Sequence, residues 1–289
     1  MILAVTGCTS VVALAAPPDK PSREYKLRLQ SARFASGQTD IVRYAETLQA
    51  HLQSLSGWAA LAPTQTSPAR QVQYIEPRGN CVLREQGYIL RWRQEADGTG
   101  QIMLKQRSPR HSNVLASSLD VGAGWRGKHK LEEDVLAKNI VELSRSVAVP
   151  VTDRAAGQTW QSTEVASIFP QIGTLLRHPD ELIVVSGKTF IETGYAWPKW
   201  TLHGVNISAE LGLWHTPEGK LAYAEVSFQG KGRSTADQDR AASLNEFFRR
   251  VQADTDSVHP QQGTKTDFVY QQSASPCQRQ QAAPQPRPD

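Results

Sequence analysis

Charged residues recur at every second position of the segments most typical of β-strands, and this pattern constrains the fold more than any other feature. The first instance is the stretch SREYKLRLQ, residues 22–30. Successive side chains of a strand point to opposite faces, so Tyr25, Leu27 and Leu29 would share one face. The other face would carry Glu24, Lys26 and Arg28. A single strand of this kind is typical of a sheet with one solvent-exposed face, so only repetition of the pattern in other strands would indicate a charged interior.

Five further segments repeat this alternation, and the six polar faces together carry eight basic and five acidic residues. The basic residues are Lys26, Arg28, Arg91, Arg93, Lys105, Arg107, Lys128 and Lys130, and the acidic residues are Glu24, Glu132, Asp134, Glu210 and Glu225. A face in contact with solvent usually carries many Thr, Gln and Ser residues, whereas this set is rich in Arg. Glu210 lies within an apolar run, where a charge is costly unless it is paired or binds a cation. We therefore predict that these residues line a barrel with a charged interior.

The order of the predicted elements indicates an α+β protein rich in strands. Strand patterns occupy residues 23–30, 70–76, 88–94, 101–108, 181–197, 204–214 and 220–230. Helical spacing predicts helices over 40–56 and 235–252, and a further helical stretch over 134–146 after a strand that begins at Lys128. Short turns such as ADGTG and HTPEG favour antiparallel pairing, and closure into a barrel would remove exposed edges. Residues 147–180 show no pattern that assigns them to an element.

Composition sets broad limits on function. The 289 residues are 39% hydrophobic, enough for one large core, and the net charge of +4 suits an anionic partner without requiring one. No block of like charges and no aromatic RNA-binding signature is present, so nucleic acid is not an expected partner. The stretch SGKT at 186–189 resembles the end of a phosphate-binding loop, but Leu182 stands where that loop needs Gly. There is no HExxH or GxSxG motif to indicate a zinc or serine hydrolase.

The two ends of the chain differ in composition from its middle. Residues 1–20 are predicted to be a signal peptide or a lipoprotein leader, because residues 2–16 are apolar or small and two prolines follow. The stretch VTGC resembles a lipobox in which Cys8 would carry a membrane tether. Export to the periplasm or envelope of a bacterium is the favoured location, and a cytoplasmic location follows if the segment is not a signal. Cys81 and Cys277 fit either a disulfide or two unpaired thiols. Residues 253–289 are rich in Gln and Pro and are predicted to be a disordered tail, which leaves residues 21–252 as the folded domain.

Six stretches in this order resemble the CYTH superfamily, the triphosphate tunnel metalloenzymes: EYKLRL, YILRWR, IMLKQR, KLEEDV, ISAELGLW and AEVSFQGKG. The resemblance covers most of residues 22–251. It implies an antiparallel eight-stranded β-barrel tunnel with helices packed outside, and hydrolysis of triphosphate compounds with Mg²⁺ or Mn²⁺. Ser22 and Ser227 depart from the family pattern, which has glutamates at these positions.

The residue types on the polar faces suit this chemistry. Arginine and lysine can hold phosphate oxygens, and carboxylates can hold a hard divalent cation. The predicted phosphate-binding residues are Lys26, Arg91, Arg93, Lys105, Arg107 and Lys188. The predicted metal ligands are Glu24, Glu132, Glu210 and Glu225, and the predicted catalytic residues are Glu24 and Lys26. A metal beside the phosphates would orient an attacking water and offset charge on the leaving phosphate.

Three functions are compatible with the sequence. The first is metal-dependent hydrolysis of a triphosphate or polyphosphate compound. The second is non-catalytic binding of a phosphorylated small molecule or another polyanion by the same barrel. Ser22 and Ser227 favour the second, and so does export, because free nucleoside triphosphates are scarce outside the cytoplasm. The third is a structural envelope protein whose interior charges pair only with one another.

Overall fold

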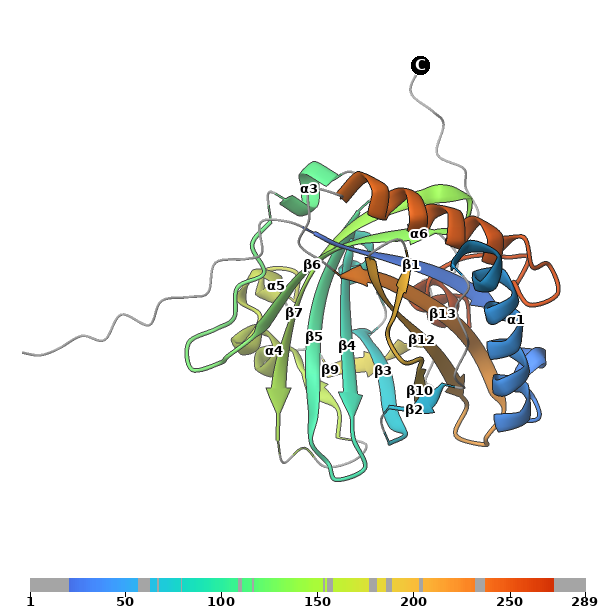
Figure 1. The fold of residues 1–289 in the computed structure, drawn as a ribbon. Helices are drawn as coiled ribbons and strands as arrows, with labels where there is room; N and C mark the ends of the chain where they lie inside the picture. The colour runs from blue at the N-terminus through green and yellow to red at the C-terminus, as the bar shows by residue number, and fades with distance from the viewer. Residues whose placement is uncertain are drawn as a thin grey trace, which may run out of the picture.

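Within the described residues, nine strands close into a barrel in the computed structural model (Figure 1). Their order around the ring is β1 (Ser22–Leu29), β6 (Lys128–Leu136), β7 (Ile140–Val151), β5 (Gly100–Ser108), β4 (Tyr88–Gln94), β3 (Arg70–Pro77), β10 (Phe190–Ala196), β12 (Val205–His215) and β13 (Leu221–Lys231). Pairing of β13 with β1 and of β3 with β10 completes the ring. The structure describes residues 21–272 except 57–62, 67, 79, 109–110, 116, 153, 155–157, 177–180, 186–188, 203–204 and 232–236.

The predicted α+β barrel with outer helices is confirmed, but the predicted eight strands and wholly antiparallel pairing are wrong. Neighbouring strands of the ring are antiparallel except β1 and β6, which run parallel and place Glu24 beside Asp134. A hairpin forces two strands to run antiparallel, whereas a long connection allows either direction. Three other barrel strands separate β1 from β6 along the chain, so no hairpin fixes their relative direction.

Residues 134–146, predicted to be helical, instead belong to a β-hairpin. β6 ends at Leu136, the 3₁₀ turn η2 (Ala137–Asn139) reverses the chain, and β7 begins at Ile140. Lys138 has a φ of 61°, a left-handed conformation that interrupts a regular helix. Leu136, Ile140 and Leu143 have helical spacing in the sequence, but pairing of both strands within the ring outweighs this local preference.

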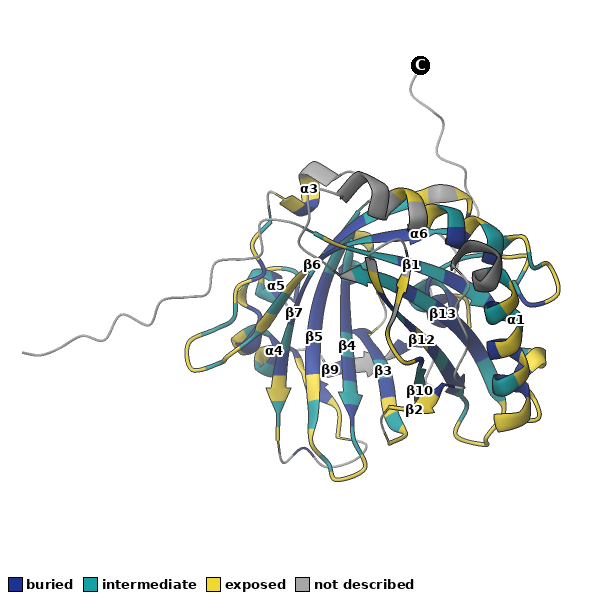
Figure 2. Ribbon diagram, in the orientation of Figure 1, coloured by how far each residue is buried: buried dark blue, intermediate teal, exposed yellow. Residues whose placement is uncertain are grey.

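Helices cover the outside of the barrel on two sides (Figure 1). The two predicted helices are present as α1 (Gln38–Ser56) and α6 (Asp237–Gln252), and they bury an apolar cluster against β1, β12 and β13. α4 (Ser162–Ile168) and α5 (Pro170–Gly173), in the stretch without a sequence pattern, pack with β4, β5 and β7 around Phe169 and Trp160. Figure 2 shows exposed residues on the outer surface of α1 and at the strand ends.

The remaining elements are short. They are β2 (Thr64–Gln65), β8 (Trp160–Gln161), β9 (Glu181–Val184), β11 (Trp200–Leu202), α2 (Val82–Glu85), α3 (His111–Leu115) and η1 (Ser31–Phe34). The predicted hairpin turns are confirmed, with Gly98 at φ +85° between β4 and β5 and Gly219 at φ +84° between β12 and β13. In the described part of the chain, no helix combines the length and apolar character that crossing a membrane would require.

The chain continues to pack beyond Gln252, which corrects the predicted start of the tail at 253. α7 (Lys265–Gln271) begins with a capping box between Thr264 and Asp267. Its Phe268 and Tyr270 are buried in an aromatic cluster with residues of β3, β10, β12 and β13, which fills part of the barrel. A Gln-rich surrounding sequence concealed this short apolar segment. Residues 273–289, the rest of the predicted tail, and the predicted leader at 1–20 lie outside the described residues.

Candidate functional site

A cavity of about 390 Å³ lies inside the barrel. Eight of the described residues that line it are basic, namely Lys26, Arg70, Arg91, Arg93, Lys105, Arg107, Lys130 and Lys265. Five are acidic, namely Glu24, Glu132, Glu192, Glu210 and Glu225. The interior is therefore strongly charged with an excess of basic groups, as the alternation along the strands predicts.

Most predicted site residues meet in this cavity. Lys26, Arg91, Arg93, Lys105 and Arg107 all line it, as do the four predicted metal ligands. Lys188 lies outside the described residues, so its placement stays a prediction. Shared position does not by itself assign a role, so phosphate binding, metal binding and catalysis also stay predictions for these residues.

Asp134 of β6 lies at the centre of the first group of charges. Its carboxylate is fully buried and contacts three cations at once. Lys26 Nζ lies 2.7 Å from Oδ1, while Lys105 Nζ and Arg107 Nη2 lie 3.1 and 2.9 Å from Oδ2. Burial alone would raise the pKa of Asp134, but the charges of Lys105, Lys26 and Arg107 hold this pKa well below its usual range. The three cations therefore favour the ionised form of Asp134.

The lysines of this group respond in opposite directions. Burial would lower the pKa of Lys26, but Glu24 at 3.0 Å and Asp134 outweigh burial and raise it. For Lys105, burial dominates, and the neighbouring charges of Arg107 and Lys26 add to it, so the pKa falls to about 8. The carboxylates near Lys105 therefore do not fully offset its burial and the neighbouring positive charges. An added anion would stabilise the charged form of Lys105.

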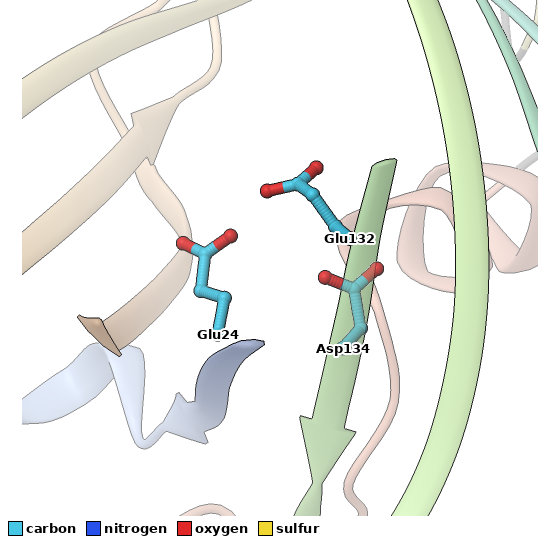
Figure 3. Close-up of side chains that lie close together, drawn as sticks. All are labelled: Glu24, Glu132 and Asp134. Carbon is cyan, nitrogen blue, oxygen red and sulfur yellow. The ribbon is translucent and has the colours of Figure 1, made fainter. Parts of the chain in front are cut away.

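Glu24, Glu132 and Asp134 form a carboxylate cluster at the junction of β1 and β6 (Figure 3). Ligand oxygens of the three lie within 4.8 Å of one another, and oxygen is the donor that Mg²⁺ and Mn²⁺ prefer. Each carboxylate already has a cationic partner, however. Lys26 contacts Glu24 and Asp134, and Lys130 contacts Glu132. The donor types fit a hard cation, while the charge balance of the cluster does not require one.

Glu192 of β10 is the centre of a second group. Its carboxylate receives Arg70 Nε at 2.7 Å and the Trp214 indole N–H at 3.0 Å. Arg93 Nε lies 3.3 Å away and Lys265 Nζ 3.5 Å away. Burial alone would raise the pKa of Glu192, but Arg93, Lys265 and Arg70 lower it well below its usual range. Like Asp134, this residue is a fixed negative charge that holds several cations around the cavity.

Arg91 differs from the other basic residues of the cavity. Among the described residues no carboxylate pairs with it, its Nη2 faces Met103 Sδ at 3.3 Å, and its buried Nε has no hydrogen-bond partner. Its neighbour Arg93 has a pKa lowered to about 10, first by burial and then by the charge of Arg91. Arg91 and Arg93 thus face the same cavity, and of the two only Arg93 has a carboxylate partner, Glu192, among the described residues.

The remaining predicted metal ligands are not grouped with the carboxylate cluster. Glu210 lines the cavity but is exposed, so the expected cost of burying its charge does not arise. Glu225 is buried, accepts a hydrogen bond from the Tyr223 hydroxyl at 3.1 Å and pairs with Lys265 at 3.2 Å. In the described residues, the four predicted ligands are therefore divided over the cavity and do not form one metal site.

Among the charged described residues that line the cavity, sequence reasoning missed three, Arg70, Glu192 and Lys265. Glu192 shares a face of β10 with Phe190 and Gly194, neither of which is charged, so the repeated charges that identified the other strands are absent there. Arg70 is the first residue of β3 and has no charged residue two positions later to reveal the pattern. Lys265 belongs to α7, in a segment predicted to be disordered.

Fold and cavity together define a closed mixed β-barrel with a charged interior. A scan against protein-family models finds no match for the chain, and a search of curated proteins finds none either.

Proposed function

We propose that the barrel binds a small polyanion, such as a phosphorylated compound or a short polyphosphate, inside its cavity. The observation that carries the proposal is Arg91, a guanidinium that faces the cavity without a carboxylate partner among the described residues. A buried donor such as Arg91 Nε is costly when it lacks a partner, and a phosphate oxygen would satisfy it with a strong charge-assisted hydrogen bond.

The surroundings of Arg91 support an anion with several charged groups. Arg93 and Lys105 have lowered pKa values because burial and nearby cations disfavour their charges, and a bound anion would relieve both effects. Arg93 is anchored by Glu192, and Lys105 is anchored by Asp134. These carboxylates hold the cations in place before a ligand arrives, which limits the ordering cost of binding.

Metal-dependent hydrolysis of the bound compound is the second candidate, favoured by the cluster of Glu24, Glu132 and Asp134. These three carboxylates would hold Mg²⁺ or Mn²⁺, and the ion would supply charge neutralisation beside the phosphates. Lys26 would then hold a phosphate oxygen, and Glu24 would orient the attacking water. Binding without turnover is preferred because Asp134 already neutralises three cations, which leaves less of its charge for a metal. Membership of the CYTH superfamily goes with this second candidate and is likewise a proposal.

One set of measurements separates these possibilities. Purified protein is mixed with tripolyphosphate, ATP or thiamine triphosphate, in EDTA, Mg²⁺ or Mn²⁺, and both melting temperature and phosphate release are recorded. Arg91→Ala removes the unpaired guanidinium, and Arg33→Ala, an exposed arginine of η1, is the matched control. Loss of a charge-assisted contact of about 1.5–3 kcal/mol would weaken binding roughly tenfold to a hundredfold.

The outcomes are distinct. A rise in melting temperature in EDTA that is lost in Arg91→Ala and kept in Arg33→Ala supports anion binding. Phosphate release that needs a metal and disappears in Arg91→Ala supports hydrolysis. If no compound stabilises the protein and no phosphate is released, both proposals are refuted and a purely structural role of the interior charges remains.

Export of the chain is a separate proposal. Cys81 is disulfide-bonded, and structural disulfides persist mainly in oxidising compartments such as the periplasm. The lipid tether at Cys8 stays a prediction from the sequence.

A further inference from the structure

Lys265 enters the cavity from α7 and occupies a socket built by three barrel strands. Its ammonium lies 3.2 Å from Glu225 on β13 and 3.5 Å from Glu192 on β10. It also lies 5.5 Å from the centre of the Trp214 ring on β12, within the range of a cation–π contact. Two buried carboxylates and an aromatic face thus converge on one ammonium group.

Gly212 provides the space for this ammonium. A Cβ atom at this position would lie 3.1 Å from Lys265 Nζ, closer than side chains normally approach. Glycine within a strand is unfavourable, and it typically marks a place where another group comes close to the backbone. Gly212 lies in the eleven-residue strand β12, paired with both β10 and β13. The missing side chain is therefore an independent sign that the socket is shaped for Lys265.

The rest of α7 holds Lys265 in position. Thr264 and Asp267 cap the start of the helix, and Phe268 is buried in the aromatic cluster. At the other end of the helix, the Tyr270 hydroxyl donates to Glu76 Oε1 at 2.5 Å. Burial alone would lower the pKa of Lys265, but Glu225 and Glu192 outweigh it and raise this pKa. The charge at Lys265 is accordingly a fixed part of the cavity.

We propose that Lys265 is a positioning residue for anion binding, one that neutralises Glu192 and Glu225 so that the neighbouring guanidinium groups can bind a ligand. The inference rests on the proposed anion-binding function. Glu192 is shared by Arg70, Arg93 and Lys265. Without the ammonium, Glu225 would lose its ion pair with Lys265 and Glu192 would keep only Arg70 and Arg93, so more negative charge would face the incoming anion. The helix α7, which is not one of the barrel strands, would thereby set the affinity of the cavity for the anion.

Chemical rescue tests this role. In the full chain, Lys265→Ala empties the socket, while Lys265→Met fills it with an uncharged side chain of similar length. Binding of tripolyphosphate in EDTA is measured for both variants, with and without propylammonium chloride, against sodium chloride at equal ionic strength. Lys220→Ala, an exposed lysine of the turn between β12 and β13, is the matched control.

We expect both Lys265 variants to bind tripolyphosphate about tenfold more weakly or worse, since a unit charge is lost within the cavity. Propylammonium should restore binding in Lys265→Ala but not in Lys265→Met, whose side chain blocks the socket. Lys220→Ala should bind as the unchanged protein does. A folded Lys265→Ala or Lys265→Met variant with unchanged affinity would overturn the inference, as would a loss of affinity in Lys265→Ala that propylammonium does not reverse. If the unchanged protein itself binds no anion, the proposed function fails first and the inference fails with it.

Discussion

Replacing Asp134 by Asn removes the charge at the centre of the first group while keeping its shape and one acceptor oxygen. Lys26, Lys105 and Arg107 then share one carboxylate fewer. Each keeps a second acidic neighbour, namely Glu24 at 3.0 Å, Glu132 at 3.7 Å and Glu142 at 3.4 Å, respectively. The variant therefore removes one carboxylate from the group, but each of the three cations still has an acidic neighbour.

Two effects of opposite sign follow. Removing one partner of a buried ion pair costs about 3–5 kcal/mol, and the second neighbours place the expected loss near the lower end, at about 3 kcal/mol. For a domain of this size the melting temperature should fall by about 6–12 °C. The cavity also loses one negative charge, so at a pH low enough to keep Lys105 protonated tripolyphosphate should bind about tenfold more tightly or better. Saturating anion should accordingly stabilise the variant more than it stabilises the unchanged protein.

Urea unfolding with and without tripolyphosphate in EDTA measures both effects in one experiment. Glu46→Gln, which removes an exposed charge from α1, is the control and should change stability by less than about 0.5 kcal/mol. If Asp134→Asn unfolds at the same urea concentration as the control, the reasoning about its three ion pairs is wrong. If the variant binds tripolyphosphate more weakly in EDTA, the inference that Asp134 opposes anion binding by neutralising its three cations is wrong.

Three further outcomes are expected. Burial raises the pKa of Glu76 from 4.5 to about 7, so its stabilising contribution is complete below pH 4.5 and is lost as the pH rises to about 7. Glu76→Gln should remove about 3 kcal/mol of this pH dependence in unfolding titrations, and an unchanged slope would contradict it. Tyr270→Phe removes a hydrogen bond to Glu76 and should cost about 1–2 kcal/mol in urea unfolding, whereas no loss would mean that α7 is not held there. Glu210→Gln should change the free energy of unfolding in urea by less than about 0.5 kcal/mol, because Glu210 is exposed. A large loss would mean that Glu210 has a stabilising partner, contrary to its exposed position.

The cavity lining was predictable because strand alternation is a local property. Arg91 and Arg93, or Lys105 and Arg107, share a face whichever strands lie beside them. The partners were not predictable, since they depend on the pairing of strands far apart in the sequence. Glu24 meets Asp134 only because β1 and β6 run parallel, a direction that no hairpin dictates. Pairing in the other direction would give these residues different neighbours.

The missed elements have a similar cause. Residues 134–146 read as a helix because Leu136, Ile140 and Leu143 happen to be spaced three or four apart, and only the places of β6 and β7 in the ring decide otherwise. α7 is seven residues long, too short to be stable alone, and its structure comes from burial of Phe268 and Tyr270 in the barrel. Lys265 could not be assigned to the cavity until that packing was known.

The charged part of the interior is difficult to explain by stability alone. Buried ion pairs are often no more stabilising than apolar residues of similar volume, and the same barrel already fills another part of its interior with Phe190, Trp214 and Phe268. Aromatic packing of that kind could have closed the whole barrel. Instead, Asp134 and Glu192 each gather several cations, and Arg91 is left without a carboxylate among the described residues. An interior whose described part pairs most of its cations with carboxylates, but not the guanidinium of Arg91, is suited to an anion that arrives from outside, and this asymmetry favours a ligand over a purely structural network.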